Sequence, residues 1–238
     1  MKTMKAAFLF WLGILFFALP AAAGDDAPSY AQSYVILIRG NVAGSENVTE
    51  TVNSAGDILS TSEHEIFVTD GLETKRMTFS TKMVLSKGTY TPISYTYKYT
   101  SSGTGDSYDV TVKDSQITRI LNRGGRTDEV TAPFQPDMVI LDFSVYHQYD
   151  YLIRKYDAKK GGRQQFADFV PVIGNDIPIA VTYLGNADGE KGIPGASSYR
   201  IDFIGLRSGT FSVDRNGRLI RLQMPTQDLE VVRKDLLK

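Results

Sequence analysis

Apolar and polar residues alternate along most of the chain, which is the pattern of strands that bury one face. In 75-KRMTFSTKMVL-85 and 92-PISYTYKYT-100 nearly every second residue is apolar or aromatic, and short turns separate such runs. Connections this short join antiparallel neighbours, because a parallel crossover needs about a dozen residues or more. The segment 57–121 therefore predicts a meander of four or five antiparallel strands.

The C-terminal third of the chain repeats this alternation in four runs: 163–173, 177–185, 198–205 and 207–225. The last run contains Asn216-Gly217, a pair typical of a type I′ hairpin turn. The final stretch, 226–238, predicts an edge strand followed by a tail. Together with the first meander, the pattern predicts two blocks of about five strands each.

The stretch 136-PDMVILDFSVYHQYDYLIRKYD-157 between the two blocks follows a helical period instead. It predicts an amphipathic helix at about 143–158, which begins after Asp142 and ends before Gly161-Gly162. The apolar positions share one face: Leu141, Val145, Tyr149, Leu152 and Tyr156. The opposite face, predicted to be solvated with an Asp150–Arg154 pair, carries His147, Asp150, Tyr151 and Arg154.

A single amphipathic helix must bury its apolar face, and the dry face of the sheet is the one large surface that the pattern offers. Sheets of about ten strands curl or split. We therefore expect a mainly β fold, a long curved antiparallel sheet or half-open barrel with the amphipathic helix packed on its concave face. The alternative is a β-sandwich with a peripheral helix.

The N-terminus predicts an export signal. Lys2 and Lys5 precede an apolar run over residues 6–19, and three alanines end at Ala23. The run is shorter than the roughly 20 residues that span a bilayer, so we expect cleavage near Ala23. The mature chain, 24–238, is then one β-rich domain with a central helix, periplasmic or secreted, and without a transmembrane segment.

Composition excludes several classes of function. There is no cysteine, so disulfides, thiolate metal sites and cysteine nucleophiles are absent. The 26 basic and 27 acidic side chains nearly balance, which argues against a nucleic-acid partner. With two histidines and no cysteine, the sequence predicts neither a metal site nor a cofactor.

Catalytic candidates are few. No Gly-x-Ser-x-Gly elbow occurs, and the only histidines are His64 and His147. Glu63 and Glu65 flank His64 in a strand, where neighbours point to opposite faces, so this trio does not converge. A hydrolase that uses His147 or His64 with a carboxylate remains an alternative, but no catalytic residue is assigned and the sequence favours a non-enzymatic protein.

Aromatic and methionine side chains gather on neighbouring strands and on the apolar face of the helix. Such residues line pockets for apolar ligands with polar heads. The predicted ligand-binding residues are Met77, Phe79, Met83, Tyr95, Tyr97, Tyr99 and Tyr149. Two functions follow from this face, namely binding of a lipid, an acyl chain or another apolar small molecule, and binding of a partner polypeptide. If the helix covers the face completely, the same residues are only core.

Residues 130–233 resemble uncharacterised bacterial periplasmic families of unknown function. The resemblance lies in Pro136 through Leu141-Asp142, the Tyr-rich segment ending near Tyr156-Asp157, Phe166-x-x-Phe169-Val170-Pro171 and the ending 211-FSVDRNGRLIRLQMPTQDLEVVR-233. It implies a fold distantly similar to the half-barrels of periplasmic lipoprotein carriers and brings no catalytic motif. It leaves three functions open: a ligand-binding protein, a cell-envelope hydrolase, and an envelope scaffold that pairs with a protein partner through an exposed strand edge.

Overall fold

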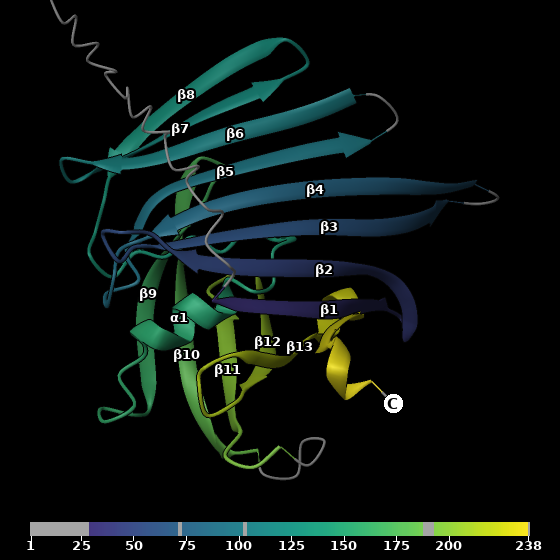
Figure 1. Cartoon of the computed structure of the whole chain (residues 1–238), viewed down its shortest axis with the longest axis vertical. Helices are drawn as coiled ribbons and strands as arrows, with labels where there is room; N and C mark the ends of the chain where they lie inside the picture. The colour runs from purple at the N-terminus through teal and green to yellow at the C-terminus, as the bar shows by residue number, and fades with distance from the viewer. Residues whose placement is uncertain (1–28, 71–72, 102–103, 188–192, 238) are drawn as a thin grey trace, which may run out of the picture.

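The protein forms one curved antiparallel sheet of 14 strands around a short α-helix (Figure 1), in a computed structural model that describes residues 29–70, 73–101, 104–187 and 193–237. The first eight strands are β1 (Tyr30–Ile38), β2 (Asn41–Val52), β3 (Ile58–Asp70), β4 (Glu73–Leu85), β5 (Pro92–Ser101), β6 (Thr104–Lys113), β7 (Gln116–Arg123) and β8 (Arg126–Pro133). After the helix α1 (Tyr149–Lys155) come β9 (Arg163–Val170), β10 (Asn175–Asn186), β11 (Ser197–Phe203), β12 (Arg207–Val213), β13 (Leu219–Met224) and β14 (Leu229–Arg233). Two 3₁₀ turns, Pro225–Gln227 and Lys234–Leu236, flank β14.

The strand order joins the two ends of the chain in the middle of the sheet. It runs β8-β7-β6-β5-β4-β3-β2-β1-β14-β13-β12-β11-β10-β9, with β14 paired to both β1 and β13. The prediction that 226–238 forms an edge strand is therefore wrong. The strands at the two edges are β8 and β9, and the sheet does not close.

The predicted fold class is confirmed: the fold is mainly β, with one long, curved, unclosed antiparallel sheet. The two blocks contain eight and six strands rather than five and five. Alternation did not reveal β2, because the inward-facing positions of this strand include Glu46 and Glu50. The predicted hairpin in 207–225 is confirmed as β12–β13, but its turn is not type I′, since only Gly217 of the Asn216-Gly217 pair has a positive φ.

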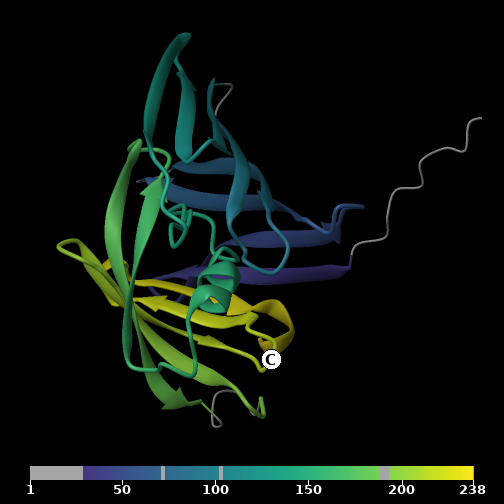
Figure 2. The ribbon, with the colours of Figure 1, turned by 90° about the vertical axis from the view of Figure 1, so that its left-hand side faces the viewer.

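The helix lies between the two halves of the sheet (Figure 2) and is shorter than predicted, Tyr149–Lys155 instead of 143–158. The backbone N–H groups of Tyr146 and His147 donate to the carboxylate of Glu46, at 3.1 and 3.4 Å. These donors are taken by a side chain of the sheet and not by the preceding turn of a helix. The first predicted turns are therefore irregular.

Both faces of this segment are buried, which corrects the prediction of a solvated face. Only 1% of His147, 1% of Asp150 and 4% of Tyr151 is exposed. Asp150 does not pair with Arg154; its carboxylate bonds Arg218 and accepts the Leu219 N–H at 2.7 Å. The cause is the curvature of the sheet, which places strands around the helix instead of against one side of it.

Polar contacts from β2 fix the helix. Glu50 forms a bidentate ion pair with Arg218, with both N–O distances 2.7 Å, and accepts the Tyr151 hydroxyl at 2.6 Å. The same guanidinium lies 3.2 Å from Asp150 Oδ2 and stacks over the ring of Tyr30. A helix of seven residues is too short to be stable by itself, so these contacts and the surrounding core hold it.

The linker, residues 134–162 between β8 and β9, carries α1 and also pairs with β9 at one edge of the open sheet. Val139 pairs with β9 next to Asp168, and the Leu141 N–H donates to Asp168 Oδ1 at 2.8 Å. Near the other edge of the sheet, the buried Arg119 of β7 lies against Gly174 in the β9–β10 turn. A Cβ at position 174 would collide with the Arg119 guanidinium. The Arg119 side chain thus brings β7, near one edge, into contact with the β9–β10 turn at the other end of the sheet.

The predicted leader, residues 1–23, lies outside the residues that the structure describes. Within the described ranges, no helix combines the length and the apolar character needed to cross a bilayer.

Candidate functional site

A cavity of about 280 Å³ opens on the concave side of the sheet, between β4–β7 and the linker. Side chains of four strands form its wall, and the linker and the β9–β10 turn form its opposite side. The lining residues are Met77, Phe79, Tyr97, Tyr99, Asp106, Tyr108, Arg123, Asp142, Phe143, Ser144 and Val172.

Four of the seven predicted ligand-binding residues line this cavity: Met77, Phe79, Tyr97 and Tyr99. The other three, Met83, Tyr95 and Tyr149, are core residues with 1%, 0% and 4% exposure and do not line it. Met83 and Tyr95 lie on the part of the sheet face that the linker and helix cover, and Tyr149 belongs to the helix itself. The predicted aromatic face is thus partly core and partly open.

Stacked rings give the cavity wall its shape. Phe79 stacks on Tyr99 with ring centroids 5.2 Å apart, and Tyr97 stacks on Tyr108 at 4.6 Å with nearly parallel planes. Each pair joins neighbouring strands, β4 with β5 and β5 with β6. Each of these contacts stabilises the arrangement of the rings that form the wall.

Charged groups lie at two places around the cavity. Asp106 and Arg123 form an ion pair of 2.6 Å with both side chains partly exposed. The buried Asp142 accepts the hydroxyls of Tyr95, at 3.1 Å, and of Tyr108. Burial raises the pKa of Asp142 to about 6, although the hydrogen bonds it accepts act in the other direction.

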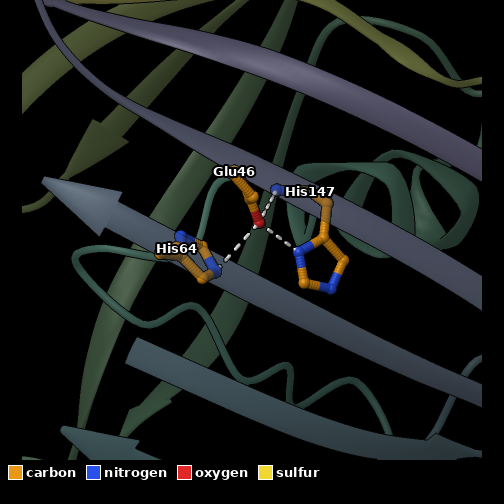
Figure 3. A group of neighbouring side chains, drawn as sticks. All are labelled: Glu46, His64 and His147. Carbon is orange, nitrogen blue, oxygen red and sulfur yellow. Dashed lines mark hydrogen bonds and ion pairs between the residues drawn. The ribbon is translucent and has the colours of Figure 1, made fainter. Parts of the chain in front are cut away.

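A cluster of three buried polar side chains, Glu46, His64 and His147, joins the linker to β2 and β3. Glu46 of β2 lies opposite His64 of β3, and His147 of the linker approaches the same carboxylate (Figure 3). Glu46 Oε1 lies 2.5 Å from His147 Nδ1 and 3.4 Å from His64 Nε2. Neither Glu63 nor Glu65 belongs to the group, as predicted from strand geometry.

The protonation of this group follows from its contacts. Burial by itself raises the pKa of Glu46, but His64 and His147 outweigh it, so the net effect is a lowered pKa and an ionised carboxylate. Burial lowers the pKa of His64, against the attraction of Glu46, which favours the neutral imidazole.

Serine hydroxyls lie beside both histidines of the cluster. Ser60 Oγ lies 3.1 Å from His147 Nε2, so Ser60, His147 and Glu46 follow the order of a hydroxyl, a base and a carboxylate. Ser62 Oγ lies 2.7 Å from His64 Nε2 and 2.6 Å from Thr81 Oγ1. Ser60 is fully buried and the cavity is not lined by it, so this serine does not meet a ligand held there.

Sequence reasoning missed Glu46. In 41-NVAGSENVTETV-52 the glutamates at 46 and 50 occupy the same strand face as Val48. When acidic residues occupy the same alternating positions of a strand as an apolar residue, they indicate buried carboxylates. This pattern in 41–52 could have predicted that Glu46 is buried. The partner in the linker, 101 residues away in sequence, had no signal of its own.

No protein-family model matches the sequence. Likewise, no curated protein is significantly similar to it in sequence.

Two solved structures are similar in fold. A β-barrel-like protein of the domain of unknown function DUF1849 from Brucella abortus superimposes with a TM-score of 0.57 and 11% identity, covering 86% of this chain and 94% of that one. A DUF1089 family protein from Pseudomonas aeruginosa gives a TM-score of 0.46 and 11% identity, covering 93% and 98%, a score too low to support an argument. The first match supports the β-barrel-like fold and agrees, at that level, with the expected resemblance to families of unknown function.

The raised pKa of Asp142 predicts a pH effect on stability. Between its ordinary value of 3.8 and about 6, the folded protein keeps a proton that the unfolded chain has released. The contribution of Asp142 therefore falls as pH rises through this window, by up to about 3 kcal/mol. We expect Asp142→Asn to remove this contribution, so that the stability difference, variant minus wild type, increases between pH 4 and 6 in urea unfolding.

The control is Asp137→Asn, which changes an exposed carboxylate of the same linker. As a surface substitution it should alter the unfolding free energy by less than about 0.5 kcal/mol. A difference for Asp142→Asn that stays constant from pH 4 to 6 contradicts the assignment.

Proposed function

We propose that the protein is an exported, non-enzymatic binding protein for an amphipathic small molecule with an apolar chain and a polar head, such as a lipid or an acyl chain. The observation that carries this proposal is the cavity on the concave side of the sheet. It combines an aromatic wall with a carboxylate and a guanidinium at its margin.

The apolar part of the ligand would lie against the rings and the thioether of β4 and β5. Met77 adapts to irregular shapes, while Phe79 and Tyr99 offer flat faces. The volume of about 280 Å³ is at the lower end of small-molecule sites. It suits a short acyl chain, or one end of a longer chain whose remainder lies outside.

The polar head would lie at the Asp106–Arg123 pair. Arg123 presents several N–H donors, and 57% of its side chain is exposed. An anionic or strongly polar head can therefore bond the guanidinium without the cost of moving a charge out of water. This orientation leaves the chain pointing toward the rings and the buried Asp142.

Two alternatives have weaker support. The order Ser60–His147–Glu46 favours a hydrolase, but full burial keeps Ser60 away from the cavity. A scaffold function rests on β8, whose outer edge has no neighbouring strand in the described sheet. Exposed charged side chains along β8 are typical of edges that avoid such pairing.

The cavity is tested with substitutions in the β9–β10 turn. Val172 lines the cavity and is 36% exposed, and the adjacent Ile173, 54% exposed, does not line it. Val172→Trp should obstruct the opening and weaken binding of a dansyl-labelled undecanoic acid by about tenfold or more, which is at least about 1.4 kcal/mol. The measurement is a fluorescence titration of wild type and variants.

Ile173→Trp is the matched control, since it adds the same bulk one residue away, and it should change the dissociation constant less than about twofold, below about 0.4 kcal/mol. Two outcomes contradict the proposal: no saturable binding by the wild type, or the same loss in both variants.

Export is tested separately. The full sequence, expressed in a Gram-negative host with its own leader, should yield a periplasmic protein whose intact mass corresponds to a chain that begins at Gly24, because cleavage is expected after Ala23. A full-length mass in the cytoplasmic or membrane fraction contradicts export.

A further inference from the structure

We propose that Glu46, His64 and His147 form a zinc-binding site that joins β2 and β3 to the linker. The three side chains offer one carboxylate oxygen and two imidazole nitrogens, all within 4.8 Å of one another. Two histidines and one glutamate are a recurrent protein ligand set for zinc. This site is independent of the proposed ligand cavity, whose lining contains none of the three.

The geometry brings the donors together from distant parts of the sequence. Glu46 and His64 are directly opposite in the β2–β3 ladder and point to the same face. His147 reaches this face from the linker, and Figure 3 shows its Nδ1 and the Nε2 of His64 both directed at the Glu46 carboxylate. No change of strand register is needed to place three ligands around one point.

Binding requires the ligand atoms, which now lie within 4.8 Å of one another, to move to the spacing of a bound zinc. Ligands of a tetrahedral zinc lie roughly 3.3 Å apart when each is about 2.0–2.1 Å from the metal. Glu46 Oε1 is already 3.4 Å from His64 Nε2, while its contact with His147 Nδ1 is 2.5 Å. Glu46 and His147 must therefore separate by less than about 1 Å as the metal replaces the proton between them.

The surroundings provide further support for a metal. On coordination through Nδ1, the ring proton of His147 lies on Nε2, which then donates to Ser60 Oγ, now 3.1 Å away. With three protein ligands, a water would complete the four-coordinate zinc. The ion pairs of Glu46 within the described residues are with these two histidines, and a divalent cation would add a positive charge beside this buried carboxylate.

A metal explains the arrangement better than catalysis does. A serine–histidine relay would need Ser60 to touch a substrate, but Ser60 is fully buried. A zinc enclosed when the linker docks makes no such demand on Ser60 and would link β2, β3 and the linker. Imidazole ligands favour zinc over calcium and magnesium, which prefer oxygen.

The test uses tag-free protein, stripped with a chelator and dialysed. Mass spectrometry of metal content after incubation with zinc chloride should give one zinc per chain. At a free zinc concentration 100 times the dissociation constant, the melting temperature should rise by about 5–10 °C, whereas magnesium and calcium should give no rise. Cobalt(II) in place of zinc should show the intense visible absorption of a tetrahedral site.

Variants separate this site from adventitious surface binding. His64→Gln and His147→Gln should abolish both the stoichiometric zinc and the shift in melting temperature. Glu63→Gln, which alters the exposed neighbour of His64, should retain both. Ser60→Ala removes only the hydroxyl beside His147 Nε2 and should weaken zinc binding by about 10-fold to 100-fold.

Measurements on the wild-type protein alone can contradict the proposal. The test is therefore conclusive even if a variant fails to fold. A zinc content well below one per chain with an unchanged melting temperature shows that the cluster is a hydrogen-bond network without metal. Stoichiometric zinc that persists in both histidine variants places the ion elsewhere.

Discussion

Two carboxylates on one face of β2 hold the structure together. Glu46 accepts hydrogen bonds from the backbone N–H groups of Tyr146 and His147 and also contacts His147 Nδ1. Glu50 binds the Arg218 guanidinium and the Tyr151 hydroxyl. Both are buried, so an unpartnered carboxylate here would cost several kcal/mol. The polar groups of the linker and Arg218, which directly precedes β13, must therefore pair with these two carboxylates of β2. This requirement fixes the position of the linker.

The shape of the sheet and the cavity follow from that placement. A 14-stranded sheet curls around whatever fills its concave side, and the filling here is a seven-residue helix and its irregular flanks. Once Tyr146 and His147 are fixed to Glu46, the preceding Asp142 to Ser144 reach the aromatic rows of β5 and β6 without covering them completely. The remaining space is the cavity, so the anchoring of the linker and the proposed binding site depend on the same contacts.

The alternation of apolar and polar residues predicted the elements that bury one apolar face. Strands with a clear dry face, such as 75–85 and 92–100, and a buried apolar stripe at Val145, Tyr149 and Leu152 are present in the structure. The pattern failed where buried residues are polar or ionisable. Strand β2 was missed because of Glu46 and Glu50, and His147 and Asp150 were expected in solvent although His147 contacts Glu46 of β2 and Asp150 contacts Arg218, just before β13. Those partners lie 101 and 68 residues away, a separation that no local pattern encodes. Four of the seven predicted residues line the cavity, because strand neighbours share a face, but the extent to which the linker covers that face was not predictable.

Hydrogen exchange tests the anchoring role of Glu46 most directly. Peptides that span 143–148 lie outside the helix, and the N–H groups of Tyr146 and His147 in them donate to Glu46 of the sheet, so slow exchange of these two amides reports that contact. The account predicts that wild-type peptides from this region are protected, and that Glu46→Gln raises their exchange by about tenfold or more, equivalent to at least about 1.4 kcal/mol, while peptides from β12 stay unchanged. Rapid exchange of 143–148 in the wild type, or protection that is unaffected by Glu46→Gln, would contradict it.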